Sequence, residues 1–503
     1  MFLGVVNNFP EYINRKRSLK IMNTKRLLSA PHFSRSLISA RRCVGAVLMT
    51  SAIVTLTLAV RVPAKPPTTP KSAFAITPLI LPNGTSEPEI SIGLDGTMGM
   101  VSLQWLFDPS NFGTDLWTGP FGSTPTFQGV IDAALQHPGK TVFGAGDADV
   151  DIGASGRLHA TTLVFLINQP FNSAQVGVSA ITCPSPASGF SIGQCTEQII
   201  DGTGDDRPWI TSEGPHVYIS YHDSGNSSLI HAQRSDDDGF TWKKIGDPVV
   251  GQGSTTGQTT FNNIQGNLVA DPRTHNVYDI YAAGVTGELK GRTFTPNNII
   301  VSRSTDMGKT WTANTAFSAL AGSNLGNIFP AMAVDPVNGN LYAVWSDGKT
   351  VSFASSKDQG NTWSAAISVS RSPAVTAMLP WIAAYNGTVD VVYYGTTATS
   401  NLDSSASWHV YFAQFNGTSF TQTQVNTAPN HIGVICTGGV GCGPGTRNLL
   451  DLFKVAIDPQ NSKAAIIYTD DTLTTSNDPN NFACNPNQSP PCPLPQAVLA
   501  QQN

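Results

Sequence analysis

Side chains that could bind or transform a ligand recur at equivalent positions along the sequence, immediately before or after the apolar hairpins. Arg207 and Arg447 carry guanidinium groups, which hold carboxylates and hydroxyls through paired donors. Carboxyl groups near them can donate a proton, remove one or act as a nucleophile. Only 13% of the residues are charged, so this concentration predicts a functional pocket. The set is Glu87, Asp147, Asp149, Asp206, Arg207, His222, Asp223, Asp347, Tyr394, His431, Arg447, Asp451 and Asp470.

The ordinary alternative for each of these residues is a polar group at a loop end, which is solvated or caps a strand. His222 beside Asp223, and His431 with Asp451, have the residue types of a general acid/base pair. A hydrogen-bonded loop histidine is the alternative for both.

A calcium site is a further hypothesis for the segment GDADVD. Asp147, Asp149 and Asp151 alternate along it, so their side chains point to the same side of a strand. Carboxylate oxygens are the ligands that Ca²⁺ prefers. A shared solvated face has the same pattern, so both interpretations stay open.

The elements that must position these residues are β-hairpins. Three segments repeat the pattern S-x-D-x-G-x-T-W, at 235–242, 304–311 and 356–363, and each follows a strand-like run. We expect the aspartate of each repeat to accept hydrogen bonds from turn amides and the glycine to supply a positive φ. The tryptophan then leads the next strand as a large packing residue.

A second unit, made of an apolar strand, a turn and an aromatic-rich strand, recurs at 89–105, 149–165, 208–223, 267–282, 330–347, 380–395 and 453–470. The spacing between units fits a four-stranded antiparallel blade with its loops. The high content of glycine (46) and proline (34) also favours a turn-rich chain over a helical one. We therefore predict an all-β protein, a β-propeller of seven blades, with six as the alternative count.

Propeller geometry assigns the candidate residues to one face. In every blade, the turn between strands 1 and 2 and the turn between strands 3 and 4 lie on the same face. The Asp-Pro turns are of the first kind and the repeated S-x-D-x-G-x-T-W turns are of the second, so both lie on that face. The opposite face is built from residues just before strand 1 and just after strand 2. We expect the ionisable set to meet there, around the central channel.

The N-terminal region differs from the rest in charge. Residues 1–65 hold 11 of the 29 Lys and Arg but one of the 34 Asp and Glu. The remaining body is acidic, which excludes it as a general nucleic-acid binder. A basic stretch, an apolar run at 43–60 and small residues after it are typical of a secretory signal. We predict a signal peptide or signal anchor at 1–64, a Pro/Thr-rich linker at 65–80 and the propeller at 81–503.

The cysteines agree with export, and membrane attachment is expected only if the run at 43–60 is retained. Cys43 lies in that run, and the other six cysteines form three sequence-local pairs. Such pairs predict three loop-closing disulfides of an oxidising compartment, with zinc binding as the alternative. The pairs are Cys183 and Cys195, Cys436 and Cys442, and Cys484 and Cys492.

The three repeated turns also support a family resemblance. With the segments DRPWI (206–210), YHD (221–223), FPAMAVD (329–335), PWIAA (380–384) and HIGVICTGGVGC (431–442), the chain resembles the sialidase-like propellers with bacterial neuraminidase repeats, or Asp-boxes. The likeness covers most of residues 80–500. It implies a secreted glycoside hydrolase that binds a carbohydrate at the mouth of the channel. The same turn also occurs in propellers with other functions.

The resemblance implies roles for individual residues. A site of this kind needs an arginine cluster, a carboxylic acid that donates a proton and a tyrosine–glutamate pair as nucleophile. Where the family has three arginines, this chain has two at the mouth, and the first-blade position reads SEPEIS. The alternative is therefore a non-catalytic scaffold that binds a carbohydrate or a protein. The implied roles are clamps for Arg207 and Arg447, general acid for Asp149 or Asp206, the nucleophilic side for Tyr394 with Glu87, and substrate contacts for His222, Asp223, His431 and Asp451.

Overall fold

The structure is a computed structural model that describes residues 73–106, 113–132, 136–137, 140–144, 146–168, 173–223, 229–249, 263–284, 295–320, 322–484 and 487–503. These residues belong to one compact unit, 70–503. The predicted leader and the apolar run at 43–60 lie outside the described residues. Within the described ranges, no helix has the length and apolar character needed to cross a membrane.

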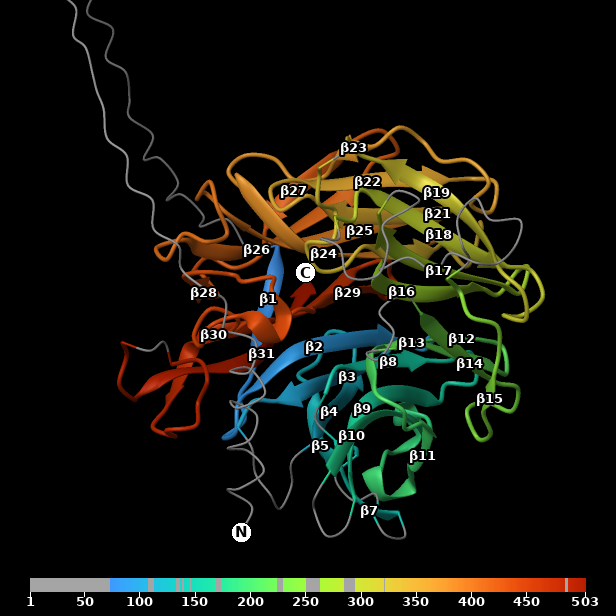
Figure 1. Ribbon diagram of the computed structural model, residues 1–503, viewed down its shortest axis with the longest axis horizontal. Coiled ribbons are helices and arrows are strands. Elements are labelled where there is room, and N and C mark those ends of the chain that lie inside the picture. The colour runs from blue at the N-terminus through green and yellow to red at the C-terminus, as the bar shows by residue number, and fades with distance from the viewer. Residues whose placement is uncertain are drawn as a thin grey trace, which may run out of the picture. The chain divides into compact units, whose positions relative to one another are not determined.

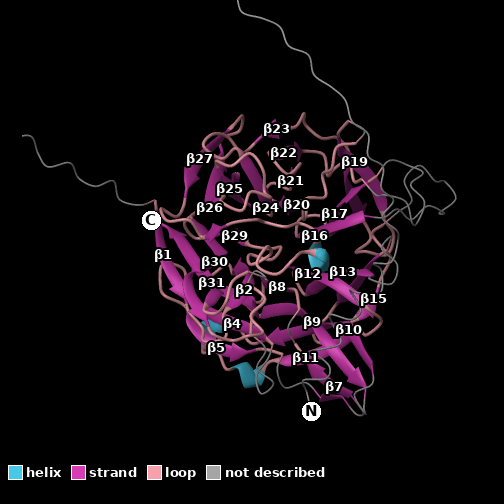
Figure 2. Cartoon of the chain, turned by 60° about the vertical axis from the view of Figure 1, so that its left-hand side comes forward, coloured by secondary structure: helices cyan, strands magenta, loops and turns pink. Residues whose placement is uncertain are grey.

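Seven antiparallel sheets form a β-propeller, as predicted from the seven hairpin units (Figure 1). Six blades place their first strand innermost, and blade 2 places β8 there, after the short strands β6 and β7. The inner strands contact one another in a closed ring, in the order β2, β8, β12, β16, β20, β24 and β29. In the part of the chain that is described, the helical elements are three short 3-10 turns, and strands dominate Figure 2. The sequence allowed six or seven blades, and the structure has seven.

The strands divide among the blades as follows. Blade 1 contains β2 (Thr85–Ile92), β3 (Thr97–Gln104), β4 (Thr114–Pro120) and β5 (Thr126–Val130). Blade 2 contains β6 (Gln136–His137), β7 (Lys140–Phe143), β8 (Ala148–Ile152), β9 (Leu158–Asn168), β10 (Ser173–Cys183) and β11 (Thr196–Asp201). Blade 3 contains β12 (Asp205–Glu213), β13 (His216–Asp223), β14 (Ile230–Ser235) and β15 (Lys243–Lys244). Blade 4 contains β16 (Asn263–Asp271), β17 (Asn276–Ala283), β18 (Asn298–Ser304) and β19 (Thr312–Ser318).

The remaining blades follow the same plan. Blade 5 contains β20 (Ala331–Val334), β21 (Leu341–Ser346), β22 (Val351–Ser356) and β23 (Ile367–Ser368). Blade 6 contains β24 (Thr376–Tyr385), β25 (Thr388–Thr396), β26 (Ser407–Phe415), β27 (Phe420–Gln424) and β28 (His431–Ile432). Blade 7 contains β29 (Lys454–Ile457), β30 (Ala464–Ser476), β31 (Cys492–Gln502) and β1 (Phe74–Leu79). The 3-10 turns are η1 (Pro186–Ser188), η2 (Ile192–Gln194) and η3 (Gly439–Gly441).

Blade 7 closes the ring with strands from both ends of the described chain. β1 pairs antiparallel with β31, in a register that joins Phe74 to Gln502 and Leu79 to Ala497. β1 lies inside the stretch 65–80 whose composition indicated a linker, so the propeller starts earlier in the chain than that boundary. The closure explains why residues so far apart in sequence share one sheet.

The three repeated turns have the predicted hydrogen bonds. Asp306 Oδ1 accepts from the Thr310 amide at 2.8 Å, and the same bond measures 2.7 Å and 2.9 Å in the other two turns. Gly308 has φ +85°, and its equivalents have φ +88° and +79°. A bond that the pattern did not predict joins the Gly308 amide to the buried Ser304 Oγ at 2.7 Å. Each turn connects strands 3 and 4 of its blade, in blades 3, 4 and 5.

These turns lie on the same face as the turns between strands 1 and 2. Asp238, in the repeated turn of blade 3, forms an ion pair with Arg157 in the first turn of blade 2, with Nε–Oδ2 at 3.0 Å. Gln359 of blade 5 accepts a hydrogen bond at 3.1 Å from Asn276, beside the first turn of blade 4. These contacts link neighbouring blades on one face of the propeller. The residues before the inner strands lie on the opposite face.

Blades are held together by apolar packing and by local cross-links. Trp345 of blade 5 stacks on Phe317 of blade 4 with ring centroids 4.8 Å apart, which buries large aromatic surfaces between sheets. All three predicted disulfides are present, Cys183–Cys195, Cys436–Cys442 and Cys484–Cys492. Each closes a short loop and none joins two distant segments.

Candidate functional site

The inner strands begin with strained residues that stand directly before prolines. Glu87, Arg207 and Leu379 have φ of 51°, 53° and 55°, a region that non-glycine residues rarely adopt. The strand register shifts at each of these positions, which marks a bulge. Such a backbone costs roughly 1–3 kcal/mol per residue, and strain of this kind concentrates at functional sites. Each bulge interrupts the alternation of side chains along its strand, so these three side chains do not follow that alternation.

Six charged residues from four blades meet at this end of the channel, and we call them the mouth cluster. The Asp451 amide donates to Glu87 Oε1 at 2.8 Å, which ties blade 7 to blade 1. Arg447 grips the Asp451 carboxylate through Nε, at 3.1 Å, and through Nη2. In blade 3, Arg207 Nε lies 3.6 Å from Asp206 Oδ2. The members are Glu87, Asp147, Asp206, Arg207, Arg447 and Asp451.

Asp147 lies within electrostatic reach of both arginines of the mouth cluster. Burial is the main cause that raises its pKa, to about 7, and the neighbouring Asp206 and Asp451 raise it further. The charges of Arg207 and Arg447 both lower the pKa of Asp147, against these effects. Asp147 therefore exchanges its proton near neutral pH, the property of a general acid.

Glu87 and Arg447 differ from Asp147 in their charge states. Burial raises the pKa of Glu87 well above its ordinary value, with Asp147 and Asp451 adding to the effect. Burial opposes the charge of Arg447, but Asp451 and Glu87 outweigh it and raise the pKa of the guanidinium group. At neutral pH the cluster thus combines a protonated carboxyl with fixed positive charge.

The other side of the mouth is apolar. Arg207 lies over the ring of Phe329, 5.1 Å from its centroid, at the boundary between the two sides. A small cavity of about 10 Å³ lies beside Asp451 and is lined otherwise by apolar residues and Pro380. A ligand at this end of the channel would meet charge on one side and apolar surface on the other.

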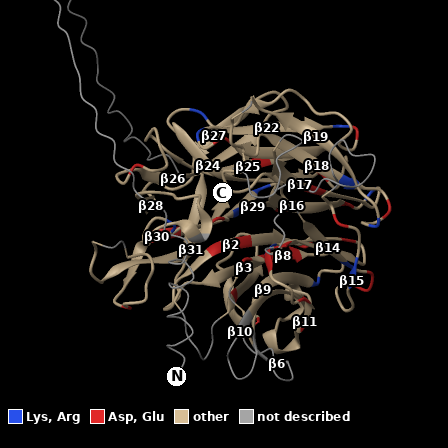
Figure 3. Ribbon diagram, viewed as in Figure 1, with Lys and Arg blue, Asp and Glu red and all other residues tan. Residues whose placement is uncertain are grey.

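Below the mouth cluster, a plug of buried side chains closes the channel. Lys454 of β29 forms ion pairs with Glu89 of β2, with Nζ–Oε2 at 2.8 Å, and with Asp149 of β8. Trp209 and Trp381, from non-neighbouring blades, stack across the channel with centroids 5.2 Å apart. Lys454 Nζ lies 4.4 Å from the Trp381 ring centroid, a cation–π contact. Figure 3 shows the acidic residues on β2 and β8.

Electrostatics within the plug favour one proton shared among two carboxyls. Burial raises the pKa of Glu89 to about 8, although Lys454 opposes the shift. Burial also raises the pKa of Asp149, against Lys454 and two backbone amides. With Lys454 charged and one of the two carboxyls protonated, the plug is neutral, as a site this deep requires.

Two residues with predicted catalytic roles lie away from the mouth cluster. Asp149 belongs to the plug, where it is 1% exposed. Tyr394 is fully buried, stacks on Phe453 at 4.1 Å and accepts a hydrogen bond from the Thr469 amide through its hydroxyl. A nucleophile needs access to substrate, so the structure does not support Tyr394 in that role. Burial also raises the pKa of its hydroxyl.

One of the two predicted histidine pairs, His431 with Asp451, has other partners in the structure. His431 Nδ1 lies 2.9 Å from Asp471 Oδ2, and its Nε2 faces the Val434 carbonyl at 3.2 Å. Asp451 instead pairs with Arg447. His222 is buried on β13, directly across from Asp206 in the strand register. Asp223 lies 3.5 Å from His231.

The three aspartates of the calcium hypothesis do not converge. They lie at successive levels along the channel, with Asp147 directly before β8 in the mouth cluster and Asp149 on β8 in the plug. Asp151 lies on the far side of the plug and accepts hydrogen bonds from Ser91 and Ser212. Across the described residues, no group of three or more His, Cys, Asp or Glu side chains is placed to hold a metal ion.

Lys454 is the functional candidate that sequence reasoning missed. The segment FKVAID (453–458) places a lysine inside an otherwise apolar inner strand. A long cation in such a strand predicts a buried ion pair, so the signal was present. Its partners Glu89 and Asp149 come from other blades, and a register across blades is not readable from sequence.

Comparison with known proteins gives a likeness of fold. No protein-family model and no curated protein matches the sequence. Among solved structures, the GH93 α-L-arabinofuranosidase of Fusarium graminearum with arabinobiose is 13% identical and has a TM-score of 0.44, covering 67% of this chain and 97% of that chain. The α-L-arabinanase of Penicillium chrysogenum is 11% identical with a TM-score of 0.42, over 71% and 98%. The NanB sialidase of Streptococcus pneumoniae is 10% identical with a TM-score of 0.39, over 84% and 68%.

Proposed function

We propose that this protein is an exported propeller that binds a glycan at the mouth cluster and hydrolyses it as a glycoside hydrolase. The observation that carries the proposal is the meeting of four carboxyl groups and two arginines at one end of the channel. Glycosidases pair a protonated carboxyl, which protonates the leaving oxygen, with an ionised one. The three disulfides support export, because such cross-links persist in oxidising compartments.

Asp147 is the proposed general acid, because its pKa, raised to about 7, lets it donate and accept a proton near neutral pH. Asp206, whose side chain is 44% exposed, is the most accessible acid among the ion-paired members of the cluster and the proposed ionised partner. Arg207 and Arg447 are the proposed clamps for hydroxyl or carboxylate groups of the sugar. Glu87 is the proposed support of Asp451, to which its carboxyl is bonded.

A non-catalytic glycan-binding scaffold is the second candidate. It is favoured by the small cavity beside Asp451 and by the bonds that already occupy Glu87, Arg447 and Asp451. A scaffold needs Arg207 and Arg447 to bind the glycan, but it needs no carboxyl group that donates a proton. The two candidates differ in whether Asp147 matters beyond binding.

The test is hydrolysis of a panel of fluorogenic glycosides by the purified protein. We expect turnover by the wild-type protein and a loss of about 100-fold or more in Asp147→Asn, because general acid catalysis contributes on that scale. Arg207→Ala and Arg447→Ala should raise KM. No turnover of any glycoside, together with retained glycan binding, would establish the scaffold. No binding to any glycan would refute both candidates.

A further inference from the structure

A second cavity occupies the channel on the other side of the plug, and we call it the lower pocket. Its volume is about 410 Å³, within the range of small-molecule sites, and residues of all seven inner strands line it. The mouth cluster contributes no residue to it. The plug residues Lys454, Asp149 and Trp381 form its inner end.

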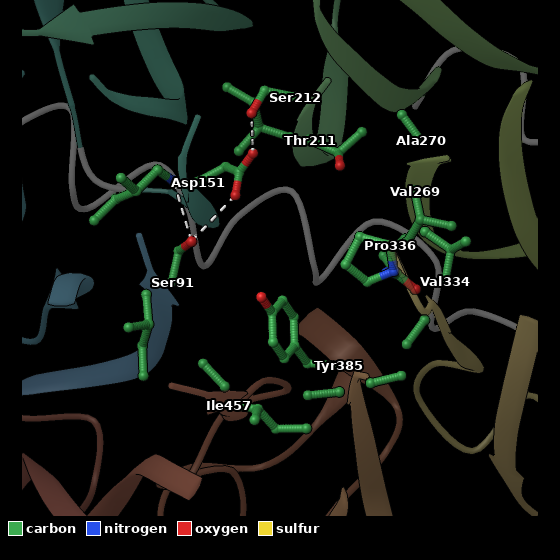
Figure 4. A pocket seen from close by; sticks show the side chains of 18 of the residues that line it. Ser91, Asp151, Thr211, Ser212, Val269, Ala270, Val334, Pro336, Tyr385 and Ile457 are labelled. Atoms are coloured by element: carbon green, nitrogen blue, oxygen red, sulfur yellow. Dashed lines mark hydrogen bonds between the residues drawn. The ribbon is translucent and has the colours of Figure 1, made fainter. Parts of the chain in front are cut away.

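One wall of the lower pocket is a carboxylate held between two hydroxyls. Ser91 Oγ donates to Asp151 Oδ1 at 3.1 Å, and Ser212 Oγ donates to Oδ2 at 2.6 Å (Figure 4). The Ile152 amide donates in turn to Ser91 Oγ at 3.0 Å, which fixes that side chain. A carboxylate has about four lone-pair positions, so Asp151 retains acceptor capacity toward the cavity.

Tyr385 adds a hydroxyl aimed at the same space. Figure 4 shows its side chain reaching into the cavity from β24. No hydrogen bond to this hydroxyl occurs among the described residues. A phenol hydroxyl is both donor and acceptor, so it can bind a polar group of a ligand.

The rest of the wall is apolar and rigid. Pro272, Pro336 and Pro459 come from the Asp-Pro turns that follow three inner strands. The aspartate before each proline accepts the amide two residues further on, at 2.9–3.0 Å, which holds the turn. Val269 and Ile457 extend the apolar surface between them.

The charge of the lower pocket is negative. Asp149, Asp151 and Glu213 line it, and Lys454 is the sole Lys, Arg or His among the described residues that do. Glu213 Oε2 is paired with His275 Nδ1 at 2.8 Å, so Asp151 is the lining carboxylate without a cationic partner in an ion pair of the described residues. Lys454 is already paired with Glu89 and Asp149. No ion pair in the described part of the chain joins Asp151 to a cationic side chain. A positive ligand is therefore favoured over a neutral or negative one.

We propose that the lower pocket binds a small organic cation, an ammonium group carried on an apolar body. The ammonium group lies against Asp151 and within reach of the Tyr385 hydroxyl. The apolar body packs against Pro336 and the neighbouring aliphatic side chains. This site is separate from the mouth cluster, so it does not depend on the proposed glycan chemistry.

The test compares three probes of one shape, benzylammonium, benzyl alcohol and benzoate, by ligand-observed NMR on the full chain. We expect benzylammonium to bind at least about tenfold more tightly than benzyl alcohol, and benzoate to show no binding. Asp151→Asn should weaken benzylammonium binding by about tenfold or more. Asp347→Asn, which removes the same charge from the exposed residue directly after β21, should leave benzylammonium binding unchanged.

Two further variants keep the result attributable to the lower pocket. Ala384→Phe narrows the cavity without changing its charge and should weaken benzylammonium binding by about tenfold or more. Asp147→Asn changes the mouth cluster and should leave benzylammonium affinity within about twofold of the wild type. Equal affinity for benzyl alcohol and benzylammonium, full affinity in Asp151→Asn, or no binding of any probe would overturn the proposal.

Discussion

At the scale of single residues, burial raises the pKa of an acidic side chain and hydrogen bonds to its carboxylate lower it. Burial raises the pKa of Glu89, in the plug, to about 8. In the repeated turn of blade 4, burial is again the largest single cause and raises the pKa of Asp306, but hydrogen bonds from Thr310 and Ser304 together outweigh it and lower the pKa to about 2. The same chain therefore carries a protonated acid, Glu89, in the plug and ionised acids in the repeated turns.

Glu89→Gln should remove part of the pH dependence of stability. The pKa of Glu89 is raised from 4.5 to about 8 on folding, so its contribution is present below pH 4.5 and lost as pH rises to about 8. Between these values the loss approaches about 1.4 kcal/mol per pH unit. The free energy of unfolding in urea, measured at pH 5 and pH 8, should therefore fall less in Glu89→Gln than in the wild type.

Asp347→Asn is the matched control, because its carboxylate is exposed. It should follow the wild-type pH dependence. An equal loss of stability between pH 5 and pH 8 in Glu89→Gln and the wild type would contradict a protonated Glu89 in the plug.

At the scale of elements, the repeated turn was predictable from sequence and the inner-strand bulges were not. The aspartate and glycine of S-x-D-x-G-x-T-W have local partners, so their roles follow from residue types. Glu87 and Arg207 take positive φ at bulges of the inner strands, although a following proline favours extended backbone, so the residue types alone do not predict this conformation. The role of Ser304 was not predictable in the same way, because its buried hydroxyl accepts a hydrogen bond from the Gly308 amide that the residue pattern did not indicate.

Ser304→Ala should destabilise the protein by about 1–2 kcal/mol. Its hydroxyl accepts the Gly308 amide and donates to Asp306, and the variant leaves both without that partner. Thermal unfolding is the measurement. Thr305→Ala, at the exposed neighbouring position, should change stability by less than about 0.5 kcal/mol. Equal melting temperatures for the two variants would count against the turn as a stabilising unit.

At the scale of the whole molecule, closure of the ring brings the candidate site together. Arg207 and Arg447 are far apart in sequence, yet both act on Asp147 because blades 3 and 7 flank the blades 1 and 2 that lie between them. Propeller geometry predicted that the residues before the inner strands share one face. It did not predict the plug, or that Tyr394 and His431 turn into the packing between strands, because those facts depend on side-chain packing across blades.

Phe74→Ala should test the closure. Phe74 is 2% exposed on β1 and packs edge-on against Phe412, with centroids 5.3 Å apart. Its truncation should lower the free energy of unfolding by about 3–5 kcal/mol. Ile76→Ala, on the same strand but 41% exposed, should cost less than about 1 kcal/mol. Similar losses in both variants would mean that β1 does not anchor the last blade.

The most direct measurement for the mouth cluster is binding of immobilised glycans by the wild-type protein, Arg207→Ala and Arg303→Ala. Arg303 donates to the Gln359 carbonyl in the repeated turn of blade 5, away from the mouth, so its variant controls for loss of one positive charge. We predict that the wild type and Arg303→Ala bind the same glycans and that Arg207→Ala loses them. Unchanged glycan binding in Arg207→Ala would contradict recognition at the mouth cluster.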